Sequence, residues 1–269
     1  MKTTLSKDGT VLAYDTYGSG PALIYITGAT CFRTFMPVVQ GAKTISQAFT
    51  VYNYDRRGRG DSGDTLPYTI EREVDDIAAL VEAAGGSAYL YGHSSGAVLA
   101  LEAALRLGDK VKGVAIYDAA YAGDEEERAD YEILAERVYE LLRAGENAKA
   151  IRCFYKGIGM PAMFIMLMPL MPGWKTMKAL APTLAYDIAL TRDLPPVERL
   201  AAINVPTYIW YGEKSPASMH RVAKRIADAL PSAKLTEFVG QDHMVSEKRL
   251  LPMLVSCFKK NFICPCRSD

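Results

Sequence analysis

The sequence lacks an excess of charge of either sign. Among its 269 residues, 31 Lys and Arg balance 31 Asp and Glu, so the composition predicts no surface for nucleic acid or another polyanion. Nearly half of the residues are apolar, which is enough for a sizeable core. We therefore expect a small-molecule partner and no nucleic-acid partner, and the sequence leaves a homo-oligomer open.

Cysteine is scarce and irregularly spaced. The count of five is odd, which argues against a disulfide framework; the residues are Cys31, Cys153, Cys257, Cys264 and Cys266. The first ten residues contain no apolar signal segment. These features predict reduced thiols and a cytoplasmic location. The Cys264-Pro-Cys266 tail has no histidine or second cysteine pair nearby, so no metal site is predicted there.

Long uninterrupted apolar runs are absent too. Residues 157–174 carry no charge, but Pro161, Pro169 and Pro172 break the run well short of the ~20 residues that span a bilayer. We expect no membrane span, and predict instead a hydrophobic cap or pocket wall. The methionines here have flexible, polarisable side chains that suit a loosely shaped apolar ligand, or equally the packing of the cap. The predicted ligand contacts are Met160, Met163 and Met166.

The sequence does contain a regular alternation of strand and helix patterns. Short buried strands are predicted at 21–28, 49–55, 87–91 and 112–120, with helical patterns between most of them. This alternation predicts a mostly parallel sheet flanked by helices on both faces. The stretch 123–195 breaks the rhythm, because it contains helical patterns and no strand pattern.

The predicted domain organisation follows from that break. Residues 1–122 and 196–269 are predicted to form one α/β core, and residues 123–195 a helical cap inserted between two strands. Asp8-Gly9, between two apolar runs, predicts a hairpin near the start of the chain. No internal repeat or low-complexity linker points to a second domain.

A corner rich in glycine and serine joins one predicted strand to the next helix. The stretch Gly92–Gly96 (GHSSG) follows the strand 87–91, precedes a helix at 97–107, and fits the G-x-S-x-G pattern with Ser94 at its centre. Such a tight turn strains its central residue and projects the hydroxyl above the sheet edge, where the helix N-terminus favours negative charge. We predict Ser94 as a nucleophile and the Ser95 backbone N–H as an oxyanion donor.

The chain resembles the α/β-hydrolase family. Tyr54–Gly63 (YDRRGRGDSG) is similar to a segment of its esterase- and haloperoxidase-like members, and Gly240–Val245 (GQDHMV) is similar to its catalytic histidine turn. The similarity covers nearly the whole chain, and implies an α/β-hydrolase fold and serine chemistry that needs no metal or organic cofactor. The arginines of the first segment are predicted to be structural hydrogen-bond donors: Arg56, Arg57 and Arg59.

The chain has three histidines, which limits the choice of a general base. His93 adjoins the predicted nucleophile and should point away from its hydroxyl, and His220 falls inside a predicted helix that starts at Ser215. His243 lies in a loop after the last strand, where an imidazole can reach a serine hydroxyl and move slightly. We therefore predict His243 as the base.

A second oxyanion donor must come from the loop after the strand at 21–28. That loop reads Thr27-Gly28-Ala29-Thr30, where many relatives have a His-Gly pair. A backbone N–H does not depend on its side chain, so the donor does not require that histidine. The Ala29 N–H is the first choice by position, and the Thr30 N–H is the second.

The acid that should orient the base departs from the family pattern. Most members carry Asp three residues after the glycine that corresponds to Gly212, but Ser215 occupies that slot here. Glu213 has a longer side chain that starts one residue past the glycine. Asp118 ends the preceding strand, where some haloalkane dehalogenases and lactone hydrolases place their acid. We predict Asp118, with Glu213 as the alternative, and expect Asp242 to stabilise the histidine turn.

These residues together predict a serine hydrolase that cleaves a small to medium hydrophobic carboxylic ester or lactone through an acyl-enzyme. The leading hypothesis is a carboxylesterase-like enzyme. A C–C bond hydrolase or a cofactor-free perhydrolase would use the same three residues. A small-molecule receptor on the same fold, with slow or no turnover, is favoured by the unusual acid slot.

Overall fold

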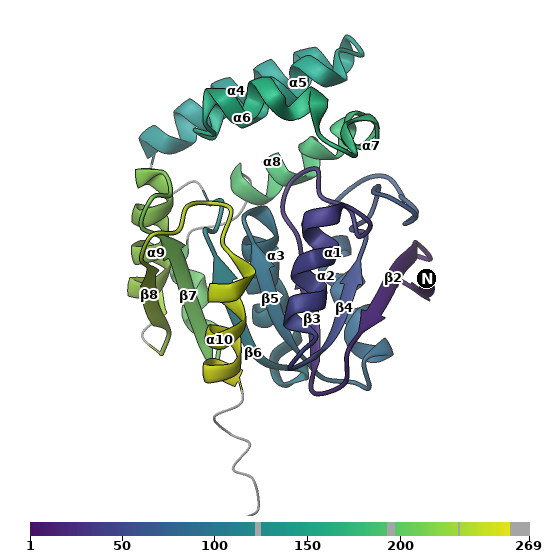
Figure 1. Cartoon of the computed structure of the whole chain (residues 1–269), viewed down its shortest axis with the longest axis vertical. Helices are drawn as coiled ribbons and strands as arrows, with labels where there is room; N and C mark the ends of the chain where they lie inside the picture. Colours follow the sequence, from purple (N-terminus) through teal and green to yellow (C-terminus); the bar gives the residue numbers. More distant parts are fainter. Residues whose placement is uncertain (122–124, 193–196, 231, 259–269) are drawn as a thin grey trace, which may run out of the picture.

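An eight-stranded, mostly parallel sheet forms the centre of the molecule (Figure 1). The structure is a computed structural model that describes residues 1–121, 125–192, 197–230 and 232–258. The strands are β1 Lys2–Leu5, β2 Val11–Tyr17, β3 Ala22–Ile26, β4 Thr50–Tyr54, β5 Ala88–His93, β6 Val111–Tyr117, β7 Thr207–Gly212 and β8 Lys234–Phe238. Their order across the sheet is β1-β2-β4-β3-β5-β6-β7-β8.

The pairing of the strands brings several loops to one edge of the sheet. β1 and β2 form the antiparallel hairpin predicted around Asp8-Gly9, and β2 also pairs antiparallel with β4. Every neighbouring pair from β4 to β8 is parallel. The carboxyl ends of these strands therefore meet at a common edge, which is where open α/β sheets bind their ligands.

Helices cover both faces of the sheet, as the alternating pattern predicts. α1 (Met36–Ile45) and α10 (Glu247–Phe258) pack on one face, and α2 (Ile70–Ala83), α3 (Ser95–Leu107) and α9 (Ala217–Ala229) pack on the other. Alternate side chains of a strand point to opposite faces. β5 accordingly contributes Leu90 to one apolar cluster and Tyr91 to the other, and both are buried.

Five more helices lie over the carboxyl edge of the sheet (Figure 1). They are α4 Glu125–Arg143, α5 Asn147–Gly157, α6 Ala162–Leu167, α7 Trp174–Ala179 and α8 Leu184–Arg192. The described residues 125–192 contain no strand. These helices share an apolar cluster with Ala29 and Phe32, which follow β3. The helical layer therefore packs directly onto the loops at the strand ends.

Short 3-10 helices complete the described secondary structure: η1 Gly108–Lys110, η2 Met168–Leu170, η3 Ala181–Thr183 and η4 Val197–Ala202. Among the described helices, none is long and apolar enough to cross a membrane. Within the same residues there is no group of three or more His, Cys, Asp or Glu that could hold a metal ion. Cys31 and Cys153 carry free thiols, whereas Cys264 and Cys266 lie outside the described residues.

Candidate active site

The strand-to-helix corner is a sharp turn between β5 and α3. Its central residue, Ser94, has φ 57° and ψ −126°, a conformation that residues with a side chain rarely adopt. The glycines on either side, Gly92 and Gly96, are required because neither position has room for a side chain. A Cβ on Gly92 would lie 2.3 Å from the Gly96 carbonyl oxygen, and one on Gly96 would lie 2.3 Å from the Ile26 carbonyl oxygen. This close approach of β3, β5 and α3 holds Ser94 at the N-terminus of α3.

His243 and Asp118 form a hydrogen-bonded pair beside this corner. Asp118 is fully buried after β6, and its Oδ2 lies 3.0 Å from His243 Nδ1. An ionised carboxylate accepts hydrogen bonds and does not donate them, so the contact assigns the imidazole proton to Nδ1. Nε2 is then free to accept a proton. Asp118 also has a positive φ of 47°, which marks a second strained position at this edge.

Ser215, in the slot where most relatives carry the acid, supports Asp118 instead. Its Oγ donates to Asp118 Oδ2 at 2.5 Å, and the Gly212 N–H donates to Asp118 Oδ1 at 3.2 Å. A Cβ on Gly212 would lie 2.4 Å from the Tyr117 hydroxyl, so glycine is needed there. Together with His243, three donors converge on one buried carboxylate, as a buried charge requires.

Glu213 and Asp242, the other two carboxylates considered, lie on the surface. Glu213 is exposed, and its Oε2 accepts a hydrogen bond from the Gly240 N–H at 2.7 Å. Asp242 is exposed too, and its Oδ1 accepts from the Met244 N–H at 2.8 Å, as expected for a residue that stabilises the turn. Of these three candidates, Asp118 is therefore the one within hydrogen-bond reach of His243.

The remaining two histidines bond to backbone carbonyls. His93 Nε2 donates to the His243 carbonyl at 2.8 Å, and the two rings lie 4.8 Å apart. Burial lowers the pKa of His93 to about 4, and the neighbouring His243 acts in the same direction, so His93 is neutral near pH 7. His220 Nε2 bonds to the Gly212 carbonyl at 2.8 Å. His93 thus holds the backbone of the loop that carries His243.

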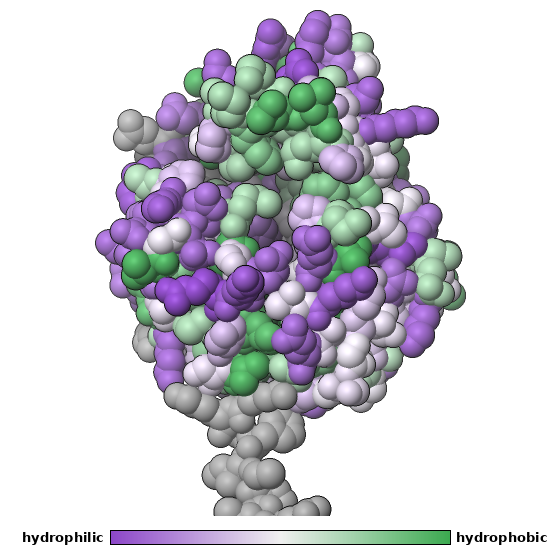
Figure 2. All heavy atoms as spheres, in the orientation of Figure 1, coloured by the Kyte–Doolittle hydropathy of each residue, from purple (hydrophilic) through white to green (hydrophobic). Residues whose placement is uncertain are grey.

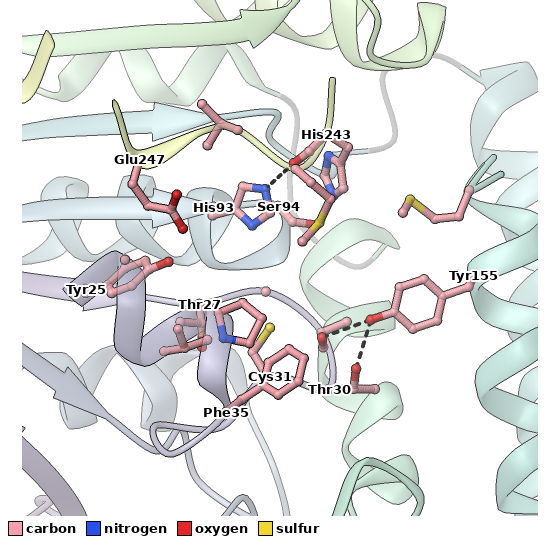
Figure 3. Close-up of a pocket in the computed structure, with 18 of the residues that line it drawn as sticks. Tyr25, Thr27, Thr30, Cys31, Phe35, His93, Ser94, Tyr155, His243 and Glu247 are labelled. Carbon is pink, nitrogen blue, oxygen red and sulfur yellow. Dashed lines mark hydrogen bonds between the residues drawn. The ribbon is translucent and has the colours of Figure 1, made fainter. Parts of the chain in front are cut away.

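Ser94 lines two cavities, and Figure 3 shows the first of them. The first, of about 370 Å³, lies between α1 and α10 and is called here the α1–α10 cavity; the second, of about 640 Å³, lies against α4, α5 and α9 and is called the cap cavity. Ser94, Ala29 and Ile158 line both, and His243 lines the first. The Ser94 hydroxyl and His243 Nε2 make no hydrogen bond within the described residues, so both are available to a ligand.

The two predicted oxyanion donors belong to segments that lie next to Ser94. Ser95 is the first residue of α3, so its N–H has no acceptor within the helix. Gly28 packs against the nucleophile, since a Cβ there would lie 2.9 Å from Ser94 Cβ. Arg59 Nη1 donates to the Gly28 carbonyl at 2.7 Å. The C=O and N–H of a trans peptide point in opposite directions, so this bond turns the Ala29 N–H away from Arg59.

Tyr155 of α5 fixes the same loop from the other side. Its hydroxyl donates to the Ala29 carbonyl at 3.3 Å and lies 2.8 Å from Thr30 Oγ1, as the dashed lines in Figure 3 show. Thr30 has a positive φ of 54°. The loop that carries the predicted second donor is therefore held both by the core, through Arg59, and by the helical layer, through Tyr155.

A buried ion cluster joins the corner to the helical layer. Arg56 and Arg59 each lie 2.8 Å from a carboxylate oxygen of Asp187 in α8. Ser95 Oγ donates to the same carboxylate at 2.7 Å. Burial alone would raise the pKa of Asp187, but Arg59, Arg56 and Ser95 outweigh it and lower the pKa below its usual range. Arg56 is also paired with Glu73.

Arg57 is the third of the arginines that the sequence predicts as structural donors. Its guanidinium pairs with Asp76 at 2.6 Å and with Asp8 at 3.0 Å, so it ties α2 to the N-terminal hairpin. The three arginines predicted as structural donors therefore all make buried structural contacts. Sequence reasoning missed Asp187, because its partners lie 128 and 131 residues away; the available signal was one acidic residue within the apolar run LAYDIAL.

The methionines of residues 157–174 divide between a cavity, the surface and the core, where Met168 is fully buried. Met160 and Met171 line the α1–α10 cavity. Met163 and Met166 were also predicted as ligand contacts, but they are 61% and 63% exposed and line neither cavity. They share one face of the short helix α6, whereas Phe164 faces the cavity. Figure 2 shows apolar side chains gathered on the helical layer, to which α6 and its exposed pair belong.

Comparison with known proteins assigns the chain to a family. The model of the alpha/beta hydrolase family matches residues 18–249. The chain therefore belongs to the α/β-hydrolase family, and the predicted fold is confirmed.

Its relatives include enzymes and solved structures. A 2-(acetamidomethylene)succinate hydrolase of Mesorhizobium japonicum is 29% identical over 86% of this chain and 84% of its own length. The crystal structure of an alpha/beta hydrolase from Sphaerobacter thermophilus is 38% identical, with a TM-score of 0.85 over 96% of this chain and 100% of that chain. The enol-lactonase of Burkholderia xenovorans shares the fold at 20% identity, with a TM-score of 0.71 over 96% of this chain and 100% of that chain.

Proposed function

We propose that the protein is a serine hydrolase that cleaves a small to medium hydrophobic carboxylic ester or lactone through an acyl-enzyme. Ser94 is the nucleophile, His243 is the general base, and Asp118 is the acid that orients the base. The observation that carries the proposal is the 3.0 Å hydrogen bond between His243 Nδ1 and Asp118 Oδ2. This bond commits the other imidazole nitrogen to proton transfer.

The proposed reaction has two halves. In the first, Ser94 Oγ attacks the acyl carbon while His243 Nε2 takes the hydroxyl proton, and the Ser95 and Ala29 N–H groups hold the oxyanion. His243 then gives the proton to the leaving oxygen; the alcohol of an ester departs, whereas the hydroxyl of an opened lactone stays attached to the acyl group. In the second half, water attacks the acyl-enzyme, His243 takes the water proton, and the same proton returns to Ser94 Oγ as the carboxylic acid is released.

The substrate class is argued from the two cavities. Their volumes of about 370 and 640 Å³ suit a small organic molecule, and an ester can place its acyl and alcohol parts on the two sides of Ser94. Met160, Phe164 and Met171 supply an apolar wall from the helical layer. We also propose that the chain has two parts: a core formed by residues 1–122 and 196–269, and a cap over it formed by residues 123–195.

Hydrolysis of p-nitrophenyl hexanoate tests the proposal. The full chain should release p-nitrophenol over many turnovers, and Ser94→Ala should abolish that release. Glu213→Gln, which alters an exposed carboxylate close to the same loop, is the matched control and should keep full turnover. Turnover that survives Ser94→Ala would refute the assignment of Ser94 as the nucleophile. Binding of the ester without release of p-nitrophenol would identify a receptor instead.

A further inference from the structure

The α1–α10 cavity has apolar walls and a polar end. Ile158, Met160, Phe164, Leu250 and other apolar residues form the walls. At the polar end lie Tyr25 of β3, His93 of β5 and Glu247 of α10. Figure 3 shows these three side chains turned toward the same space. The proposed ester chemistry makes no use of this end of the cavity.

His93 presents a hydrogen-bond acceptor there. Its Nε2 donates to the His243 carbonyl at 2.8 Å, so that nitrogen carries a proton. The pKa of about 4, set mainly by burial, keeps the ring neutral, and a neutral imidazole has a proton on one nitrogen alone. Nδ1 of His93 is therefore an acceptor, and a ligand group beside it must donate.

Tyr25 adds a hydroxyl at the same end. Burial raises the pKa of Tyr25 well above its usual value, and Cys31 and Glu247 act in the same direction, so the hydroxyl stays protonated. The hydroxyl lies against α1, where a Cβ on Gly41 would come within 3.3 Å of its oxygen. It makes no hydrogen bond with any described residue. A tyrosine hydroxyl can both donate and accept hydrogen bonds, so its oxygen can accept a hydrogen bond from a ligand.

Glu247 supplies the charge of this end. It is the first residue of α10, where the helix dipole stabilises a negative charge. The carboxylate makes no hydrogen bond or ion pair with the residues that the structure describes. None of the described residues that line the cavity is Lys or Arg. The negative charge therefore has no partner in the cavity and is open to a ligand.

We propose that Tyr25, His93 and Glu247 form a specificity site for a substrate group that donates hydrogen bonds, and that a primary ammonium fits it best. An ammonium carries three N–H donors and a positive charge, which match two acceptors and one carboxylate. A hydroxyl can donate one hydrogen bond without the charge and should bind less tightly. A carboxylate would meet acceptors and a like charge. The inference rests on the proposed function in one respect: the substrate reaches Ser94 through this cavity.

Isothermal titration calorimetry with three six-carbon ligands tests the site. Hexylamine, hexanol and hexanoate share one apolar chain and differ in the end group. In the full chain carrying Ser94→Ala, we expect hexylamine to bind at least about tenfold more tightly than hexanoate, with hexanol between them. Adding Glu247→Gln should weaken hexylamine binding by about tenfold and change hexanol binding by less than about threefold.

A second carboxylate provides the control. Asp130 lines the cap cavity and is exposed, so Asp130→Asn should leave hexylamine binding unchanged if the amine occupies the proposed site. Hexanoate that binds as tightly as hexylamine, or an amine preference that survives Glu247→Gln, would overturn the proposal. These measurements read binding alone. A failure of Ser94 to form an acyl-enzyme would leave them unaffected, so the two proposals fail separately.

Discussion

Replacing Asp187 by asparagine should destabilise the protein by about 3–5 kcal/mol, the usual cost of removing one partner from a buried ion pair. Arg59 is almost fully buried, and Asp187 is its only ion-pair partner within the described residues. Arg56 keeps Glu73, so one guanidinium rather than two loses its counter-charge. Because a buried arginine stays protonated, the charge of Arg59 would remain without compensation.

Urea unfolding followed by circular dichroism measures this cost. A typical domain is stable by about 5–15 kcal/mol, so the loss should move the midpoint clearly. Glu213→Gln, on the surface, should change the free energy of unfolding by less than about 0.5 kcal/mol. The double variant Arg59→Met/Asp187→Leu should recover much of the loss, because it removes both charges. A loss below about 1 kcal/mol for Asp187→Asn would refute this reasoning.

The same substitution should also reduce turnover in protein that remains folded. Asp187 holds the Ser95 hydroxyl directly and holds the Gly28 carbonyl through Arg59, so we regard it as a positioning residue for both oxyanion donors. We expect kcat to fall by about tenfold or more with little change in KM, since removal of a whole donor costs about 10²–10³. An unchanged kcat well below the unfolding temperature would limit Asp187 to a structural role.

Three further predictions test other parts of the site. Asp118→Asn should lower kcat in the p-nitrophenyl ester assay by about 10³–10⁴-fold. Adding Ser215→Asp, which puts a carboxylate at the position most relatives use, should restore part of the lost kcat. No recovery would contradict the proposal that a carboxylate at residue 215 can replace Asp118 as the acid. Gly96→Ala places a Cβ 2.3 Å from the Ile26 carbonyl oxygen and should lower the melting temperature by several degrees, whereas an unchanged value would contradict the close approach. The pKa of His93 is lowered to about 4 in the folded protein, so between about pH 6.5 and pH 4 the unfolded chain binds a proton that the folded chain does not. The free energy of unfolding should therefore decrease as the pH falls from about 6.5 to about 4. His93→Gln, which can still donate to the His243 carbonyl, should flatten that decrease in urea titrations, and identical pH profiles would contradict the assignment.

The parts of the site that could be predicted are those set by local pattern. The Gly92–Gly96 corner combines motif, preceding strand and following helix within about 20 residues, so sequence alone places Ser94 between β5 and α3. His243 followed from the small number of histidines and its position in a loop. The parallel order of the strands also explains why Asp118, after β6, lies beside a loop that is 125 residues further along the chain.

Features that depend on contacts between distant segments were not predictable. Asp187 is one acidic residue within an apolar run of the sequence until the fold places it between Arg56 and Arg59. The choice between Asp118 and Glu213 depended on the path of the loop after Gly212, because the sequence alone allows either carboxylate to reach His243. The outward direction of Met163 and Met166 depends on how α6 rests on its neighbours, which a run of apolar residues does not encode.

The most direct test of the central claim is the intact mass of the protein after reaction with a fluorophosphonate probe, followed by peptide mapping. We expect one covalent adduct per chain, located on Ser94, and none in Ser94→Ala. Labelling should be slowed strongly in His243→Ala, because the base no longer takes the serine proton. An adduct at another residue, or an unmodified Ser94 after prolonged exposure, would contradict the proposal that Ser94 is the nucleophile of an acyl-enzyme.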